Sequence, residues 1–200
     1  MPIPRRLFLL AGLPGGLLAA ASVAAQPTLV IVEGQRFERR IRLIDHDLLL
    51  NGTGVRGVAW IKGYAAALYL AAPARSVAAV LAMAGPKRLQ LRMLQEAPAA
   101  EFVKAVRKGM ERNAAPDELP RLAARLQALE ARIAATGTVR PGDVVDLDLD
   151  PARGLLFSLN GTLQGEPIAG EDFYAALLRA FIGELPYDKK LRAGLLGQPV

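Results

Sequence analysis

The 200-residue chain contains no cysteine and a single histidine, His46. Without cysteine it can form no disulfide, no thiolate zinc site and no cysteine nucleophile, and it has no lipid-anchor cysteine. One histidine provides no histidine cluster for a metal and leaves little room for a Ser-His-Asp triad. His46 stands between Asp45 and Asp47 in a predicted exposed turn. We therefore expect no metal and no organic cofactor, and most recognisable enzyme classes are excluded.

Aromatic residues are also few, at 6%, but hydrophobic residues make up 52% of the chain and charged residues 22%. This balance excludes a fully disordered chain and allows a sizeable core in one domain. No long linker, low-complexity segment or repeat array interrupts residues 26–200.

Residues 1–25 have the layout of a secretory signal peptide. Arg5 and Arg6 form a positive region, an apolar stretch follows, and small residues precede a cleavage site after Ala25. The arginine pair also fits a twin-arginine export signal. The alternative, a retained signal anchor, is disfavoured by Pro14 and the two glycines that follow it. We predict a cleaved leader, no membrane span in the remaining domain of residues 26–200, and a periplasmic product.

The net charge of the predicted mature chain is small. Removing the two leader arginines from the 25 basic residues leaves 23 against 19 acidic ones, a net charge of +4. Arginines cluster over residues 36–42, but Phe37, Ile41 and Leu43 alternate with them at the period of a strand. A solvated strand face explains this pattern better than a nucleic-acid groove, so we expect no nucleic-acid partner.

Hydrophobic periodicity predicts strands first, then helices, then strands and helices again. Asn51-Gly52 and Asn160-Gly161 are tight-turn signals, because both central positions of a type I′ turn need positive φ. We expect strands over residues 28–32, 37–50, 55–70, 87–94, 143–150 and 155–159, and helices over 74–84, from 101, from about 117, over 172–182 and over 188–195. Hairpin turns in place of crossovers favour an antiparallel α+β fold.

Three aspartates, Asp146, Asp148 and Asp150, alternate with apolar residues, and a calcium loop begins in the same way. That loop needs glycine at its sixth position and glutamate at its twelfth, where this chain has Pro151 and Phe157. We interpret the three aspartates as the solvated face of a strand.

A glycine-rich segment surrounds one arginine just before an alanine-rich strand. Gly52, Gly54 and Gly57 flank Arg56, and such glycines allow a ligand or another backbone to approach closely. A guanidinium there offers a planar fork of donors to a carboxylate, phenolate or enolate. The alternative is an ordinary surface arginine beside a turn.

Dispersed but ordered motifs resemble the chalcone isomerase-like family, in its exported bacterial branch, over nearly all of residues 27–197. They are the Leu-Asn-Gly-x-Gly-Val-Arg-Gly run at 50–57, the strand at 62–70, the Asn-Gly…Gly…Ile-x-Gly-x-Asp-Phe run at 160–173, and the ending at 176–197. The resemblance implies an open-faced β-sandwich, in which helices cover a large antiparallel sheet and a ligand cleft lies between them.

The resemblance also implies roles for Arg56 and Tyr64. In the plant enzymes the family arginine polarises an oxyanion while a phenolate adds to a conjugated enone. In non-catalytic relatives an arginine and a tyrosine meet the carboxylate of a fatty acid. By motif position, the arginine is Arg56 and the polar position after Lys62-Gly63 is Tyr64. We also expect an apolar pocket near Val58, Trp60 and residues 65–67, with Trp60 as a further ligand-binding residue.

This chain departs from the family pattern in two respects. Arg56 and Tyr64 are eight residues apart, and in one unbroken strand they would be separated by about 26 Å, unless a glycine bends the chain. The enzymes' helix asparagine falls among residues 104–107, where there is none, and their hydroxyl falls at about Ala180. Lost donors remove transition-state stabilisation.

Three functions follow, and the sequence leaves them open. The leading hypothesis is an exported protein that binds a hydrophobic carboxylic acid or similar small ligand, with Arg56 as the anion anchor. The second is an isomerase or intramolecular lyase in which Arg56 is catalytic and stabilises an oxyanion. The third is a periplasmic structural or assembly partner without a ligand.

Overall fold

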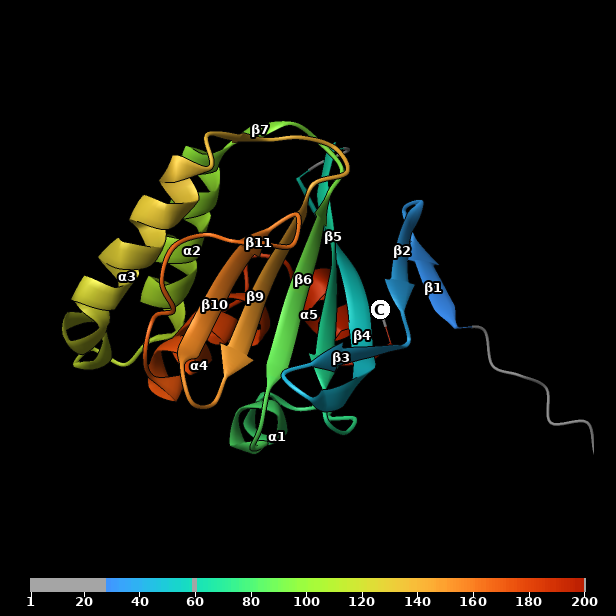
Figure 1. The fold of residues 1–200 in the computed structure, drawn as a ribbon, viewed down its shortest axis with the longest axis horizontal. Helices are drawn as coiled ribbons and strands as arrows, with labels where there is room; N and C mark the ends of the chain where they lie inside the picture. Colours follow the sequence, from blue (N-terminus) through green and yellow to red (C-terminus); the bar gives the residue numbers. More distant parts are fainter. Residues whose placement is uncertain (1–27, 59–60, 200) are drawn as a thin grey trace, which may run out of the picture.

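A computed structural model describes residues 28–58 and 61–199; the predicted leader, residues 1–25, and Trp60 lie outside the described residues. Seven antiparallel strands form the main sheet in the order β11-β10-β9-β6-β5-β4-β3 (Figure 1). Their bounds are β3 (Arg40–Leu43), β4 (His46–Val58), β5 (Ile61–Leu70), β6 (Lys87–Met93), β9 (Val144–Asp150), β10 (Gly154–Leu159) and β11 (Thr162–Leu163).

The helices pack against one face of this sheet and form the larger core. They are α1 (Val77–Ala82), α2 (Ala99–Asn113), α3 (Glu118–Ala135), α4 (Glu171–Ile182) and α5 (Lys189–Leu195). Helix α3 lies outside α2, and the short strands β7 (Ala97–Pro98) and β8 (Thr138–Val139) pair where these two helices meet the sheet (Figure 1). The predicted antiparallel α+β fold is confirmed.

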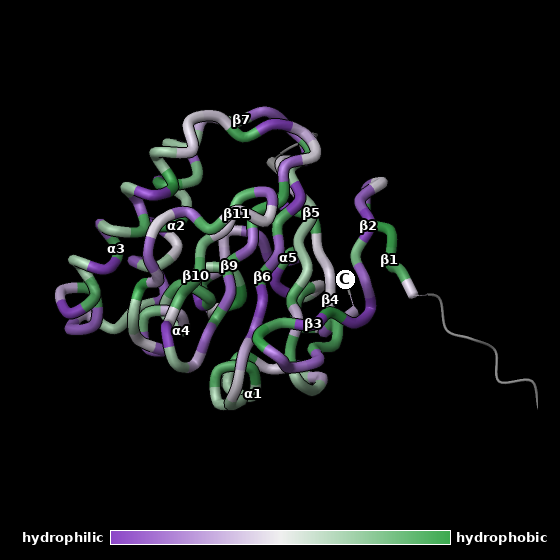
Figure 2. Tube along the Cα trace, viewed as in Figure 1, coloured by the Kyte–Doolittle hydropathy of each residue, from purple (hydrophilic) through white to green (hydrophobic). Residues whose placement is uncertain are grey.

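The middle helices, predicted from residue 101 and from about residue 117, each bury one apolar face in the core. Hydrophilic and hydrophobic residues alternate along α2 and α3, as Figure 2 shows. Val106 and Met110 on α2, and Leu122, Leu129 and Ile133 on α3, are almost completely buried. No helix in the described part of the chain is both long and apolar enough to cross a bilayer.

The opposite face of the sheet is partly covered by a separate hairpin of β1 (Leu29–Val32) and β2 (Gln35–Glu38). Phe37 of this hairpin is fully buried in a second, smaller cluster that includes Ala65, Ala67 and Tyr69 of β5. The guanidinium of Arg92 lies 5.4 Å from the centre of the Phe37 ring. The sheet is therefore apolar on both faces at β5.

Two predicted strand boundaries are wrong. The predicted strand over 37–50 is divided by a turn at Ile44 and Asp45, whose φ values are 47° and 60°. The exposed turn predicted around His46 therefore exists directly before it, and Ile44 adopts a left-handed conformation that is rare for an isoleucine. Asn51-Gly52 is no turn, because β4 continues through it with a register shift between Leu50 and Gly52. Asn160-Gly161 is the predicted turn, with φ of 52° and 77°.

The aspartates of β9 are buried, so the prediction of a solvated strand face is wrong. Asp146 and Asp148 are 6% and 3% exposed. Arg88 on the neighbouring strand β6 donates to both oxygens of Asp148, at 2.7 and 2.6 Å, and Gln90 donates to Asp146 at 2.9 Å. Long polar side chains from β6 therefore cover these carboxylates and donate hydrogen bonds to them. The sequence pattern of β9 alone cannot reveal such partners on another strand.

Among residues 28–58 and 61–199, no group of three or more histidine, cysteine, aspartate or glutamate side chains could hold a metal ion.

The glycines around residue 53 accommodate another backbone, which was one of the two expected uses. A Cβ at Gly52 would lie 2.8 Å from the carbonyl oxygen of Leu195 and closer still to that of Gly194. The side-chain amide of Asn51 forms hydrogen bonds to two neighbouring segments. Its nitrogen donates to Leu195 O at 2.8 Å, and its oxygen accepts from Ala74 N at 2.7 Å. Helix α5 is thus packed backbone to backbone on β4.

We expect Gly52→Ala to destabilise the protein by about 1–3 kcal/mol or more, because the added methyl group meets main-chain atoms that cannot rotate away. Urea unfolding at 25 °C measures this change. Gly63→Ala is the matched control on β5, where an added Cβ would meet Arg56 O at an ordinary 3.6 Å. Equal stability of the two variants would contradict the close packing of α5 on β4.

Candidate functional site

The β4–β5 hairpin brings Arg56 and Tyr64 together. The predicted single strand over 55–70 is wrong, because β4 ends at Val58 and β5 begins at Ile61, antiparallel to it. Arg56 and Tyr64 are direct cross-strand partners. Opposed Cα atoms in such a pair are about 4.5–5.5 Å apart and their side chains share a face. The separation of about 26 Å, expected for an unbroken strand, therefore does not occur.

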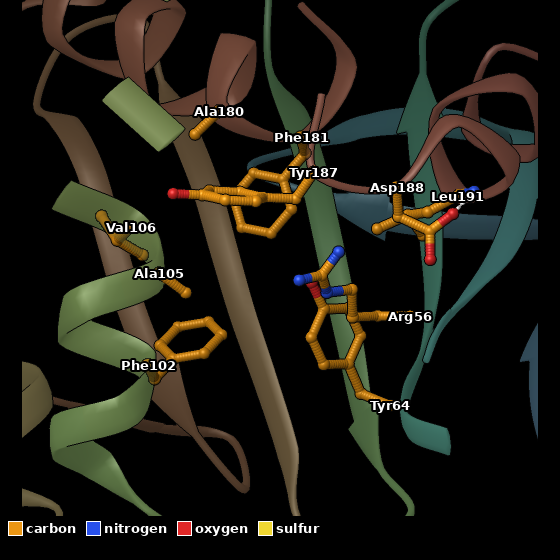
Figure 3. Close-up of a pocket in the computed structure, with 10 residues that line it drawn as sticks. All are labelled: Arg56, Tyr64, Phe102, Ala105, Val106, Ala180, Phe181, Tyr187, Asp188 and Leu191. Carbon is orange, nitrogen blue, oxygen red and sulfur yellow. Dashed lines mark hydrogen bonds between the residues drawn. The ribbon is translucent and has the colours of Figure 1, made fainter. Parts of the chain in front are cut away.

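Both side chains line a cavity of about 60 Å³ between the sheet and the helices. Figure 3 shows Arg56 and Tyr64 on the sheet side, with side chains of α2 facing them across the cavity. Helices α2, α4 and α5 and the segment before α5 supply the rest of the wall. The lining residues are Arg56, Tyr64, Phe102, Ala105, Val106, Ala180, Phe181, Tyr187, Asp188 and Leu191.

Arg56 has an aromatic neighbour in the described structure and no acidic partner there. Its guanidinium carbon lies 5.4 Å from the centre of the Tyr187 ring, and that of Arg112 lies 4.6 Å from the same centre. Within residues 28–58 and 61–199 the Arg56 guanidinium forms no salt bridge and donates no hydrogen bond. Its donors are therefore available to an anion in the cavity.

The Tyr64 phenol lies against the helix-side core. Burial raises the pKa of Tyr64 well above its ordinary value; the nearby Arg56 lowers it and Asp188 raises it by smaller amounts. The phenol therefore stays neutral and keeps its proton at any physiological pH. A neutral hydroxyl beside a cation can donate a hydrogen bond to an anion that the arginine holds.

Asp188 contributes a carboxylate to the cavity wall and also caps the helix next to it. One of its oxygens accepts from the main-chain nitrogens of Lys190 and Leu191, at 2.9 and 3.0 Å, and so caps the start of α5. Its other oxygen lies 3.5 Å from the nitrogen of Gly57, next to Arg56. The N-cap thus joins α5 to the end of β4 and sets one negative charge near the arginine.

The helix side of the cavity is apolar. Phe102, Ala105 and Val106 come from α2, and Ala180 comes from α4. Residues 104–107 and Ala180 are the positions at which the resemblance would place the enzymes' asparagine and hydroxyl. The lining residues contributed by α2 and α4 include no hydroxyl or amide side chain.

The predicted pocket is only partly the observed one. Trp60 lies outside the described residues, as does the side chain of Val58. The alanines at 65–67 are completely buried and do not line the cavity; Ala65 and Ala67 face the β1–β2 side. They fill the sheet because β5 is covered on both faces, so small side chains there do not mark a vacant space.

Sequence reasoning missed Tyr187, Asp188 and Phe102 as lining residues. Phe102 lies in the helix predicted from residue 101, Tyr187 lies directly before the helix predicted over 188–195, and Asp188 was predicted as the first residue of that helix. A signal existed for Asp188, because an aspartate directly before a helix is a typical N-cap. Sequence spacing could not show that this cap faces Arg56, 132 residues earlier in the chain.

We expect alkaline pH to destabilise the protein partly through Tyr64. The unfolded chain loses the phenolic proton at the ordinary pKa, whereas the folded chain retains it, so stability is full below that pKa and falls as pH rises above it. Tyr64→Phe should make this fall shallower by up to about 1.4 kcal/mol per pH unit. Urea unfolding from about pH 8 to about pH 11.5 tests this, and superimposable profiles would contradict the burial of the hydroxyl.

Solved structures match this chain, and one of them is a plant protein. The crystal structure of a fatty-acid binding protein from Arabidopsis thaliana aligns with a TM-score of 0.61 and 18% sequence identity, over 84% of this chain and 95% of that chain. At this identity the match shows a shared fold. No curated protein matches the sequence.

A family model described as chalcone isomerase-like matches residues 30–197. This range includes the β4–β5 hairpin, the helical layer and the α5 segment that together build the cavity. The chain therefore belongs to the chalcone isomerase-like family.

Proposed function

We propose that this protein binds a hydrophobic carboxylic acid, such as a fatty acid, with its carboxylate on Arg56 and Tyr64. One observation carries the proposal: a guanidinium without an acidic partner in the described structure lies beside a buried neutral phenol, at a cavity whose helix side is apolar. The arginine would supply the charge and two parallel donors, and the tyrosine would supply a third.

The chemistry of the wall favours an anion with an apolar body. A buried carboxylate is costly unless it is paired and hydrogen-bonded, and Arg56 with Tyr64 would meet both requirements. Phe102, Val106 and Leu191 would contact the apolar part of the ligand. A fully polar anion would make no apolar contact with these three side chains.

The structural match supports this proposal at the level of the fold. The matching Arabidopsis chain is called a fatty-acid binding protein, and it is covered almost completely by the alignment. The proposal for this chain depends on its own residues, because identity is 18%.

Catalysis as an isomerase is less well supported by the same cavity. Enone cyclisation needs donors that stabilise a developing oxyanion, and each such donor is worth several kcal/mol. Ala105, Val106 and Ala180 supply none. Incubation of the purified protein with chalcone, followed by absorbance, tests this alternative, and turnover that depends on Arg56 would replace binding as the function.

We further propose that the protein is exported to the periplasm after cleavage behind Ala25. The support is the sequence of residues 1–25, with its arginine pair, apolar stretch and small residues. N-terminal sequencing of the protein recovered from the periplasm tests the proposal, and an N-terminus at Met1 or Pro2 would contradict it.

We expect Arg56→Ala to weaken binding of decanoate by about 1.5–3 kcal/mol, the range for charge-assisted hydrogen bonds. Isothermal titration calorimetry measures the change. Arg121→Ala is the matched control, because Arg121 is an exposed arginine on α3 that pairs with Asp117. Unchanged affinity in Arg56→Ala, with binding retained, would remove Arg56 from the site.

We expect Asp188→Asn to bind decanoate several-fold more tightly than the wild type, because the substitution removes a negative charge near the bound carboxylate. Asparagine retains an acceptor oxygen for the start of α5, so the helix cap should persist. The gain should shrink as ionic strength rises. Weaker binding with an unchanged melting temperature would show that Asp188 assists the ligand.

A further inference from the structure

A second cavity adjoins the first, near the strands β7 and β8. Its volume is about 10 Å³, and α2, the end of α3 and the strands β6, β9 and β10 supply its wall. Eight of the nine lining residues are apolar, and the hydroxyl of the ninth, Thr136, donates to Ile133 O at 2.7 Å. The lining residues are Met93, Ala99, Phe102, Ile133, Thr136, Val139, Val145, Phe157 and Leu159.

Phe102 is the residue that lines both cavities. Along α2, Ala99 lines the second cavity, whereas Ala105 and Val106 line the first. Residues three and four apart share a helix face, so Phe102 stands between the two spaces on that face. From Ala99 to Val106 the helix rises by about 10 Å.

The two cavities are also adjacent on the side of the sheet. Tyr64 of β5 lines the first cavity and Met93 of β6 lines the second, and these two residues are cross-strand partners. The cavities are therefore neighbours on the helix and on the sheet. The Phe102 ring projects from α2 toward the sheet, as seen in Figure 3.

The first cavity alone is small for the proposed ligand. Its volume of about 60 Å³ is less than half that of a cavity of about 150 Å³ that binds benzene. A long acyl chain needs further apolar space in line with the carboxylate site. The second cavity extends the apolar lining in that direction, and its lining presents no free charge. At about 10 Å³ it cannot hold a tail by itself, so most of the space would come from displacement of the Phe102 ring, which lies between the two cavities.

We propose that Phe102 is a partition between the two cavities, and that its side chain rotates aside when a long acyl chain binds, so that Phe102 sets the chain-length preference. This inference rests on the proposed binding of hydrophobic carboxylates. Phe102 is partly buried, and its ring can move between staggered χ1 rotamers. The tail would then pass from Arg56 across the Tyr64–Met93 boundary toward Phe157.

The test compares octanoate with myristate by isothermal titration calorimetry. In Phe102→Ala the partition is removed, so affinity for myristate should rise about tenfold relative to octanoate, which corresponds to burial of roughly two further methylenes of the longer tail. Val103→Ala is the matched control: it is the next residue on α2, it packs on the core and it lines neither cavity. That variant should leave the ratio of the two affinities unchanged.

A second variant tests the far cavity without altering Phe102. Ala99→Leu places a larger side chain in that cavity, so it should weaken myristate binding at least several-fold and leave octanoate binding unchanged. Circular dichroism melting verifies that each variant is folded. An unchanged ratio in both folded variants would overturn the role of Phe102 while the proposed function stands. Failure of the wild type to bind either acid would overturn the proposed function itself.

Discussion

The antiparallel pairing of β4 with β5 positions the site. It sets Arg56 directly opposite Tyr64, so a cation and a neutral hydroxyl share one face of the sheet although eight residues separate them. The same pairing continues to Gly52 and Gly54, whose missing side chains allow α5 to rest on the β4 backbone. Because α5 begins at its Asp188 cap, this close packing also fixes the carboxylate that faces the arginine.

Burial determines which groups of the site carry a charge and which stay neutral. The positive charge of Arg56 lies near Tyr187 and Asp188, whereas the neighbouring Tyr64 is kept neutral because burial raises its pKa. The Asp188 oxygens accept from main-chain nitrogens, so the guanidinium of Arg56 has donors left for a ligand that brings its own negative charge. Asp188 reduces the net positive charge of the cavity wall. The smaller charge limits the free-energy cost of keeping the arginine in the wall when no ligand is bound, and it sets how strongly an anion is attracted.

Sequence reasoning reached the fold class, and it singled out Arg56 and Tyr64 without showing how the chain brings them to one cavity. Alternation and helical periodicity are local, so they revealed strands and helices. They did not show that the strand predicted over 37–50 breaks at Ile44 and Asp45, although a turn was expected around His46. The burial of Asp148 depends on Arg88 from another strand, sixty residues earlier. Such tertiary pairing leaves no signal in the pattern of either strand alone, which is why the aspartates were predicted to be solvated.

The two sides of the cavity differ in the chemistry of their lining residues. The sheet side carries the charge and the donor, whereas the lining residues of α2 and α4 carry only hydrocarbon surface. A reaction would need donors at the point where charge develops, and on α2 those positions hold Ala105 and Val106. Helix side chains can therefore alter the shape of the space without disturbing the anion anchor. In the proposed binding mode, the hairpin would select the head group and α2 would set the length of the tail, because Phe102 lies between the two apolar cavities.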